Sequence, residues 1–299
     1  MRYLLAGSSG FLGTALRVDL AAQGHQAARL VRREPATATE YRWDPDAGSL
    51  DPSVFDGVDV VVNLCGVGIA DRAWTKARRE LLRSSRINPT RTLALALAER
   101  SAPLPVLIQG SAIGWYGTEP TDVPLTEAAP AAEDFIGELV EDWERAAQPA
   151  AQAGVRTVFL RTSPVMDRGG GAFQPMRTAW SLGLATKLGD GSQHMPMIAL
   201  DDWLRALQWA AETADAQGPY NLTIPQPSTN AEFTDALADA LHRPSLFKAP
   251  AGLVRLGLGE LAEQLVGDIW VVPQRLVEGG FVFTAPDARG VVRAALRRS

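Results

Sequence analysis

Three glycines near the start of the chain lie between an apolar, strand-like run and a helix-like segment. This stretch reads Gly7-Ser8-Ser9-Gly10-Phe11-Leu12-Gly13. The first glycine permits a tight turn, the second lets the backbone approach a pyrophosphate, and the third lets the helix pack closely on the strand. The unpaired N–H groups at the helix N-terminus then face the phosphates. We therefore predict that these seven residues bind a nucleotide cofactor; the alternative is a small-residue turn without a ligand.

Strand-like and helix-like segments alternate over the first half of the chain. This alternation is typical of a parallel sheet covered by helices on both faces. The strand-like runs are Tyr3 to Ala6, Ala27 to Val31, Val58 to Leu64, Val106 to Gly110 and Val155 to Leu160, and the helix-like segments are Phe11 to Gln23, Thr75 to Arg100 and Glu133 to Ala153. The predicted fold class is therefore α/β, with a Rossmann-type doubly wound parallel sheet.

The sequence changes character after Leu160, where a glycine-rich stretch at 168–171 and a proline-rich turn at 225–229 follow. Both are turn signals. We place a boundary near residue 165, which predicts a nucleotide-binding domain over 1–165 and a smaller C-terminal α/β domain over 166–299. Ligands of doubly wound folds lie above the carboxyl ends of the strands, so we expect this substrate-side domain to close over that crevice.

The second predicted strand ends in Leu30-Val31-Arg32-Arg33, at the position that selects between the two dinucleotides. An acidic residue here would bind the ribose 2′-hydroxyl of NAD, whereas guanidinium groups pair with a 2′-phosphate through charge-assisted hydrogen bonds. Arg32 and Arg33 therefore predict NADP(H) as the cofactor; a solvated strand end is the alternative. The third strand ends in Leu64-Cys65-Gly66, which we place beside the adenosine half of the cofactor. We expect Cys65 to be a packed residue, because burial suppresses formation of a nucleophilic thiolate.

Charge and residue types argue against several other classes of protein. The formal net charge of −5 argues against sequence-independent binding of nucleic acid, which needs a basic surface. Cys65 is the single cysteine, which rules out an internal disulfide, and the three histidines have no zinc-ligand spacing, so no metal is expected. No apolar run approaches the roughly 20 residues that span a bilayer. The first residues show no signal-peptide pattern, so we expect no membrane contact and a cytoplasmic location.

Further motifs resemble a known family. The glycine turn, the Asn63-Leu64-Cys65-Gly66 turn and the run from Gly110 to Gly117 resemble the extended short-chain dehydrogenase/reductase superfamily. Five runs are similar to its atypical subgroup, named "epimerase family protein" or sugar-nucleotide epimerase: Trp43-Asp44-Pro45, 84–90, Asp142-Trp143-Glu144, Leu160-Arg161-Thr162 and 227–233. The tail resembles the small C-terminal domain of unknown function in that subgroup, through Leu258-Gly259-Glu260, Val272-Pro273, Arg275-Leu276 and 280–283. The resemblance covers essentially the whole chain.

This resemblance implies where catalytic groups would lie. Active members of the superfamily use a Tyr-x-x-x-Lys pair, whose tyrosine acts as general acid/base, and a serine after the fourth strand that orients the substrate oxygen. Ser111 stands at the serine position, but Phe135 and Leu139 stand where the tyrosine and lysine would fall. Tyr116, five residues after Ser111, is the candidate to replace the missing acid, with packing as its alternative role.

Two acids and three residues of the second half complete the candidates. Glu127 and Glu138 would also reach the crevice, although exposed helix acids are their default interpretation. Ser163 and Pro164 follow the fifth strand near the expected nicotinamide, and Gln193 lies in a glycine-bounded loop as a substrate ligand. Ordinary loop turns are the alternative for these three.

One motif on the substrate side departs from the family. The pattern Gln-x-x-x-Trp-Ile-His-x-x-Asp has Met197 and Ala199 in place of its tryptophan and histidine. Loss of the histidine removes a polar group, so the resemblance says less about the substrate than about the cofactor.

Three functions remain open at this stage. The leading hypothesis is an NADP(H)-binding oxidoreductase or epimerase-like enzyme that acts on a small carbonyl, polyol or nucleotide-linked substrate without the usual dyad. The second is a non-catalytic NADPH-binding protein that regulates a partner or senses redox state. The third is a structural protein on a vestigial Rossmann scaffold. The sequence also leaves open whether the chain forms a homodimer.

Overall fold

The computed structural model describes residues 1–101, 103–171, 173–181, 186–243, 247–250, 252 and 262–297. The chain divides into two compact units, and each is built from segments that lie far apart in the sequence. The first unit contains Met1–Ser111, Glu138–Leu160 and Leu207–Pro219; the second contains Ala112–Gly137, Arg161–Ala206 and Tyr220–Ser299. The chain therefore passes between the units more than once. The single domain boundary near residue 165 stays a prediction.

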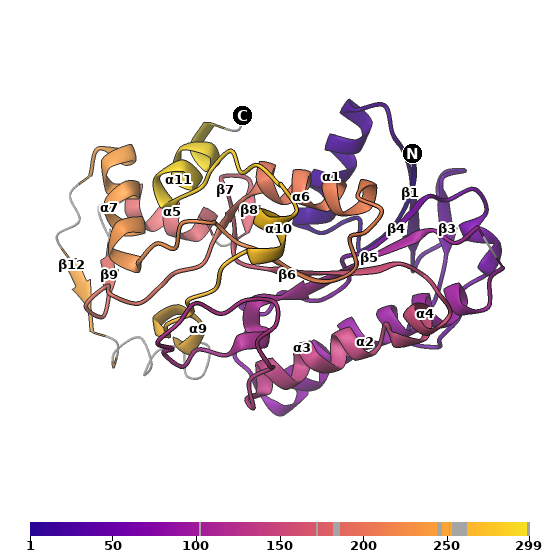
Figure 1. Cartoon of the computed structure of the whole chain (residues 1–299), viewed down its shortest axis with the longest axis horizontal. Helices are drawn as coiled ribbons and strands as arrows, with labels where there is room; N and C mark the ends of the chain where they lie inside the picture. Colours follow the sequence, from indigo (N-terminus) through magenta and orange to yellow (C-terminus); the bar gives the residue numbers. More distant parts are fainter. Residues whose placement is uncertain are drawn as a thin grey trace. The chain divides into compact units, whose positions relative to one another are not determined.

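A seven-stranded sheet with the order β11-β6-β5-β4-β1-β2-β3 organises the first unit (Figure 1). Its strands are β1 (Arg2–Ala6), β2 (Gln26–Val31), β3 (Glu40–Arg42), β4 (Val60–Asn63), β5 (Val106–Ala112), β6 (Thr157–Thr162) and β11 (Gly218–Leu222). The pairs from β3 through β2, β1 and β4 to β5 are all parallel. The strand order reverses between β1 and β4, which is where doubly wound sheets bind their ligands. The predicted α/β doubly wound fold is confirmed.

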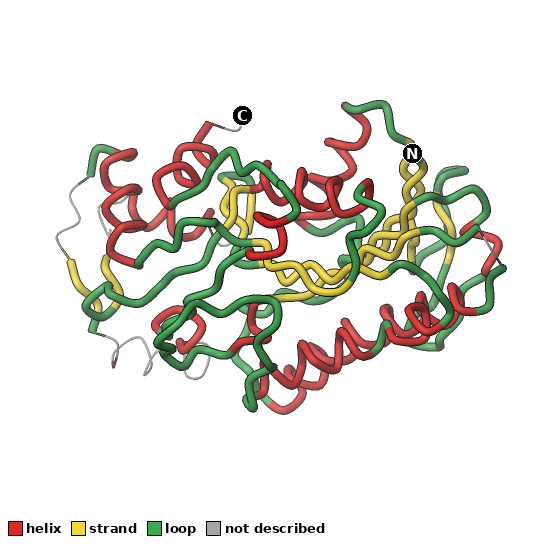
Figure 2. Tube along the Cα trace, in the orientation of Figure 1, coloured by secondary structure: helices red, strands yellow, loops and turns green. Residues whose placement is uncertain are grey.

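Helices cover both faces of this sheet, as Figure 2 shows for the strands between two helical layers. One face carries α2 (Lys76–Ala98), α3 (Phe135–Arg145) and α4 (Gln148–Gln152), and the other carries α1 (Phe11–Ala22) (Figure 1). A short helix, η1 (Pro52–Phe55), precedes β4. The core packs apolar side chains of β1, β2 and β4 against α2 and the residues around α4. Burial on both faces explains why these strands read as continuous apolar runs.

The predicted strands are all present with small shifts of their ends, but β3 and β11 were not predicted. Both lie at the edges of the sheet, and their short sequences EYR and GPYNL lack a long apolar run. The helix predicted over 133–153 is wrong as a single element, because it is divided into α3 and α4. Asp134 Oδ1 accepts a hydrogen bond of 2.7 Å from Gly137 N, so α3 begins after it. Pro149 lies in the first turn of α4, where its missing N–H costs least.

The second unit contains two small sheets and several short helices. Its sheets have the orders β10-β7-β8 and β12-β9. Its elements are η2 (Ile113–Tyr116), β7 (Val165–Asp167), β8 (Gly170–Gly171), α5 (Phe173–Ser181), β9 (Thr186–Leu188), β10 (Ile198–Ala199), α7 (Asn230–Leu241), β12 (Phe247–Ala249), α9 (Glu263–Val266), α10 (Gln274–Glu278) and α11 (Ala288–Arg297); α6 (Leu200–Glu212) runs from this unit into the first. A buried cluster that includes Met166, Phe173, Phe233 and Val291 forms its core.

Candidate nucleotide-binding site

The conformation of the glycine turn after β1 requires glycine at two of its positions. Gly7 has a φ of 77°, and a Cβ there would lie 2.5 Å from the carbonyl carbon of Leu64. A Cβ on Gly13 would lie 2.3 Å from the carbonyl oxygen of Gly7. Both distances are far shorter than a van der Waals contact, so the turn itself requires these two glycines.

Gly10 has no such internal reason to be glycine. Its φ is −72°, which any residue adopts, and the nearest atom to an added Cβ is 3.7 Å away. The residue is exposed. Its missing side chain therefore leaves space on the outside of the turn, where the backbone remains accessible to a ligand.

The N-terminus of α1 adjoins this space. Gly10 is the N-cap residue and supplies no side-chain hydrogen bond to the first turn of the helix. Ser8 is buried, whereas Ser9 is exposed; Phe11 and Leu12 are partly buried. The first N–H groups of a helix have no partner within it and carry a partial positive charge. The geometry therefore suits an anion.

The turn after β4 is fixed by a buried asparagine. Asn63 Nδ2 donates to Thr90 Oγ1 and to Gln109 Oε1, both at 3.0 Å, and its Oδ1 accepts from Cys65 N at 3.1 Å. These bonds hold the Leu64-Cys65-Gly66 turn next to the glycine turn. Burial raises the pKa of the Cys65 thiol to about 12, and the positive charge of Arg32 opposes the shift only in part. The thiol is protonated at neutral pH, which agrees with a packing role.

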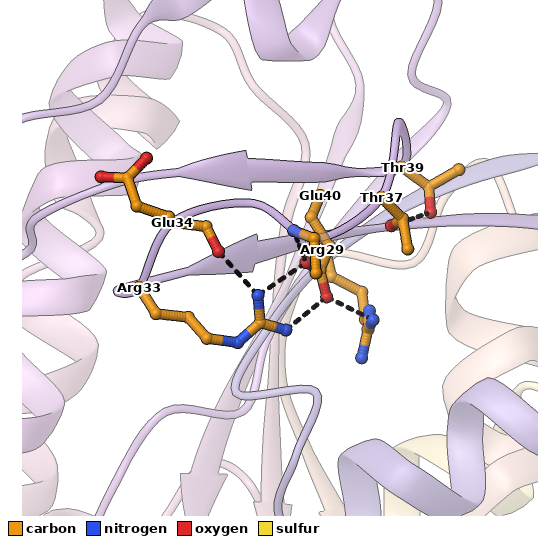
Figure 3. Close-up of polar contacts among 7 residues, drawn as sticks. Arg29, Arg33, Glu34, Thr37, Thr39 and Glu40 are labelled. Carbon is orange, nitrogen blue, oxygen red and sulfur yellow. Dashed lines mark hydrogen bonds and ion pairs between the residues drawn. The ribbon is translucent and has the colours of Figure 1, made fainter.

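The two arginines after β2 differ in their contacts. Arg33 donates to both oxygens of the Glu40 carboxylate, through Nη1 at 2.8 Å and Nη2 at 2.7 Å, and Nη1 also donates to the Glu34 carbonyl oxygen at 2.8 Å (Figure 3). Arg29 pairs with the same carboxylate from the neighbouring strand. Arg32 is exposed, and within the part of the chain that the structure describes its side chain makes no hydrogen bond or ion pair.

The sequence did not single out Glu40. Its side chain is fully buried, and Arg33, the Ala36 N–H and Arg29 together lower its pKa to about 2. A glutamate seven residues after an arginine, with a loop between them, is not a recognisable sequence motif. The parallel pairing of β2 with β3 brings Arg29 and Glu40 together.

Ser111, at the end of β5, also has an unexpected partner. Its Oγ donates a hydrogen bond of 2.6 Å to Glu144 Oε1 on α3, and both side chains are buried. Glu144 follows the buried Val140 by four residues, so helical spacing places it on the buried side of α3. That spacing is a signal by which Glu144 could have been found.

The sequence of α3 shows whether the Tyr-x-x-x-Lys dyad of the superfamily is present. The helix has the sequence FIGELVEDWER, which contains neither tyrosine nor lysine. Leu139 is buried in the core, Phe135 is partly buried and Glu138 is exposed. The ionisable group on the buried side of this helix, next to Ser111, is Glu144.

Tyr116 lies in the second unit, in a buried network of its own. Its hydroxyl donates to Asn221 Oδ1 at 2.7 Å and accepts from Arg161 Nη1 at 3.0 Å. The Arg161 guanidinium also lies 3.7 Å from the centre of the Trp115 ring. Burial raises the pKa of Tyr116, and Arg161 opposes this shift. The hydroxyl therefore has internal partners for both its donor and its acceptor.

The default interpretation of Glu127 as an exposed helix acid is wrong. It is buried in a turn and accepts hydrogen bonds from Asn221 N at 3.0 Å and from Arg275 N at 3.4 Å. Burial raises the pKa of its carboxyl group, while these bonds lower it. The carboxyl group joins three segments of the second unit.

The remaining candidates of the second unit are also engaged internally. Ser163 is buried, and its Oγ donates to the Leu222 carbonyl oxygen at 2.7 Å; the Pro164 carbonyl oxygen accepts from Ile198 N at 3.1 Å. Gln193 Nε2 donates to the Leu188 carbonyl oxygen at 3.1 Å. Met197 and Ala199, which replace the tryptophan and histidine of the family pattern, are both in the apolar core.

The reversed strand order, the glycine turn and the uncapped helix together define a Rossmann-type α/β protein. Family comparison places it further: residues 3–223 match the NAD dependent epimerase/dehydratase family, and residues 249–295 match a domain of unknown function (DUF1731). The chain belongs to the NAD dependent epimerase/dehydratase family. This confirms the resemblance seen in the sequence, although Leu258-Gly259-Glu260 of the tail lies outside the described residues.

Similar proteins cover nearly the whole chain. "Epimerase family protein Mb2239" of Mycobacterium bovis is 44% identical over 93% of this chain and 92% of its own length. The crystal structure of human epimerase family protein SDR39U1 (isoform 2) with NADPH is 30% identical, covers 100% of both chains and has a TM-score of 0.90. That of the nucleoside-diphosphate sugar epimerase from Corynebacterium glutamicum is 31% identical, covers 99% of this chain and 58% of that one, and has a TM-score of 0.80.

Two features are absent from the described residues. None of the helices they form is long and apolar enough to cross a membrane. Nor do these residues bring together three or more His, Cys, Asp or Glu side chains that could hold a metal ion.

Proposed function

We propose that this protein binds NADP(H) and acts as an oxidoreductase or epimerase-type enzyme on a small carbonyl, polyol or nucleotide-linked substrate. The observation that carries the proposal is the space over Gly10, which the turn does not need and a pyrophosphate would fill. The structure of the human relative with NADPH supports the choice of cofactor.

In this proposal the first unit binds most of the cofactor. The turn from Gly7 to Gly13 and the first N–H groups of α1 hold the pyrophosphate. The segment after β2 that carries Arg32 and Arg33 forms the 2′-phosphate site, and Leu64-Cys65-Gly66 lies along the adenosine half. Ser163 and Pro164 are proposed neighbours of the nicotinamide, through backbone and ring surfaces because the Ser163 hydroxyl is bonded internally. Gln193 is retained as a substrate ligand.

Ser111 and Glu144 supply the proton transfer in this proposal. When bound, the nicotinamide accepts or donates a hydride. Ser111 Oγ accepts the proton of the substrate hydroxyl while its own proton passes to Glu144 Oε1 along the 2.6 Å hydrogen bond. Substrate reduction reverses both transfers. A carboxylate thus takes the place of the tyrosine and lysine that α3 lacks.

A second candidate is a non-catalytic NADPH-binding protein that regulates a partner or senses redox state. The composition of α3 favours it, because Phe135 and Leu139 stand where the family resemblance expects the dyad. Phenylalanine and leucine cannot transfer protons.

Calorimetric titration with NADPH, NADH and both oxidised forms tests the cofactor. We expect NADPH to bind at least about tenfold more tightly than NADH, and the double variant Arg32→Ala/Arg33→Ala to lose that margin. No binding of any form would refute the proposal and favour a vestigial scaffold.

Oxidation of NADPH with a panel of carbonyl compounds tests catalysis. We expect turnover that falls about 100-fold or more in Ser111→Ala and Glu144→Gln, with NADPH affinity unchanged. Tight NADPH binding without oxidation across the panel would favour the non-catalytic candidate.

A further inference from the structure

Arg32 and Arg33 are neighbours in the sequence, but their side chains differ in their contacts. Arg33 turns toward β3, where Glu40 binds it through two hydrogen bonds (Figure 3). Arg32 is exposed, and its side chain makes no hydrogen bond or ion pair with the other described residues. Both arginines follow β2, which pairs in parallel with β1, and the glycine turn follows β1. Arg32 is therefore the arginine available to a ligand at these strand ends, whereas Arg33 is held by Glu40.

The partners of Arg33 already take three of its five N–H groups. Both N–H groups of Nη1 are used, one by Glu34 O and one by Glu40 Oε2, and Nη2 gives one more to Glu40 Oε1. The carboxylate of Glu40 is buried, whereas the Arg33 side chain is 56% exposed, so a buried group fixes the direction of a guanidinium at the surface. A 2′-phosphate that approached Arg33 would compete with a buried carboxylate of its own sign, which already holds the guanidinium through two hydrogen bonds.

Glu40 also fixes the loop that carries both arginines. Besides Arg33 it accepts a hydrogen bond of 2.7 Å from Ala36 N, and its cross-strand partner Arg29 pairs with it on β2. One buried carboxylate therefore holds the start, the middle and the end of the connection between β2 and β3. Fixing a loop in advance lowers the entropy lost when a ligand binds to it.

We propose that Arg32 alone binds the 2′-phosphate of NADP(H), and that Arg33 and Glu40 form a clamp that positions the loop from which Arg32 projects. This inference rests on the proposed binding of NADP(H) and refines it. It divides the two arginines into a ligand and a positioning residue, and it gives Glu40 an indirect part in the site although it contacts no cofactor.

The test is a calorimetric titration of NADPH, NADH, adenosine 2′,5′-bisphosphate and AMP with single variants of the full chain. We expect Arg32→Ala to lose NADPH and bisphosphate affinity by about 10- to 100-fold, with NADH and AMP unchanged. Arg33→Ala should keep the ratio of NADPH to NADH affinity within about threefold of wild type while its thermal midpoint falls. The matched control is Glu34→Gln, because Glu34 forms an exposed ion pair with Arg42 in the same loop, and it should change neither quantity.

Arg33→Ala leaves the buried Glu40 carboxylate with fewer partners, which destabilises the fold, so Arg33→Ala/Glu40→Gln removes the carboxylate charge as well. This double variant should also keep the ratio within about threefold. Conservative Arg33→Lys should restore part of the thermal midpoint, as expected of a residue that positions the loop.

Two results would overturn the division of roles. The first is that Arg33→Ala or the double variant loses as much NADPH preference as Arg32→Ala does. The other is a preference that persists in Arg32→Ala, or a wild-type protein that binds NADPH and NADH equally. If wild type binds neither dinucleotide, the proposed function itself fails, which separates the two failures.

Discussion

The glycine turn of the first unit and the Tyr116 network of the second unit both contain residues that the sequence singles out, but they satisfy their polar groups differently. The Tyr116 hydroxyl both donates and accepts internal hydrogen bonds, and the Glu127 carboxylate also accepts such bonds. At the glycine turn, Gly10 leaves space that no side chain fills, and the helix N-terminus has no side-chain cap. Buried groups with internal partners stabilise a fold, whereas exposed groups without them are available to a ligand. The first unit therefore holds the better binding site.

Removal of Arg161 should have the largest effect on stability. Arg161→Met takes away a buried guanidinium that stacks on Trp115 and donates to Tyr116. We expect the free energy of unfolding to fall by about 2 to 4 kcal/mol in chemical denaturation. NADPH affinity of the folded variant should stay within about twofold. If Arg161→Met kept its stability but lost NADPH affinity, the Tyr116 network would be the binding region, which would contradict this comparison.

Alanine substitutions at the glycines of the turn should differ in their effect on the free energy of unfolding. Gly13→Ala forces a Cβ against the Gly7 carbonyl, so we expect a loss of about 1 to 3 kcal/mol in unfolding free energy. Gly10→Ala has room, and its stability should change by less than about 1 kcal/mol.

The same pair distinguishes folding from binding. Gly10→Ala should weaken NADPH at least about tenfold in a titration although the fold is intact, because the added methyl occupies the space proposed for the pyrophosphate. Wild-type affinity in Gly10→Ala would remove the main support for the binding site.

Tyr116 should prove structural. Tyr116→Phe removes the buried hydroxyl that donates to Asn221 Oδ1 and accepts from Arg161 Nη1, which should cost about 1 to 2 kcal/mol of unfolding free energy. Since burial raises the pKa of Tyr116 above its usual 10.0, the hydroxyl stays protonated at neutral pH. The pH profile of any turnover should therefore be the same in Tyr116→Phe as in wild type. A profile that loses its alkaline limb would restore Tyr116 as a catalytic acid.

The smallest effect concerns the pH dependence of the Glu40 clamp. The folded-state pKa of Glu40 is lowered from its usual 4.5 to about 2, so its contribution to stability is complete above about pH 4.5 and is lost as the pH falls toward 2. The difference in thermal midpoint between wild type and Glu40→Gln should shrink over this range. Glu34→Gln is the control and should track wild type at every pH. A difference that persists at pH 2 would show that packing, not charge, makes the Glu40 contribution.

The fold was largely predictable, and the reasons are local. Apolar runs such as that of β4, whose sequence is VVVN, identify strands buried on both faces. Edge strands β3 and β11 have no such run, since they gain their place by pairing with β2 and β6. Within the helix predicted over 133–153, Asp134 sets the start of α3 and Pro149 lies in the first turn of α4, and a count of apolar residues overlooks both effects.

The candidate site was predicted only in part. Glycine spacing located the turn, but it could not distinguish Gly10 from Gly7 and Gly13, because that distinction depends on the distance to Leu64 and to the turn's own carbonyl groups. Ser111 was named from the family resemblance, while its partner Glu144 required the packing of α3 beside β5.

By itself the sequence determined the alternation of strands and helices, the glycine turn and the pair of arginines after β2, because each follows from residue type and short-range spacing. Only the tertiary structure decided which polar groups have internal partners. Glu40 meets Arg33, Ser111 meets Glu144 and Tyr116 meets Asn221 across sequence separations of 7, 33 and 105 residues. Such contacts depend on which strands and helices pack together, and it is these contacts that separate a residue that holds the fold from one that is available to a cofactor.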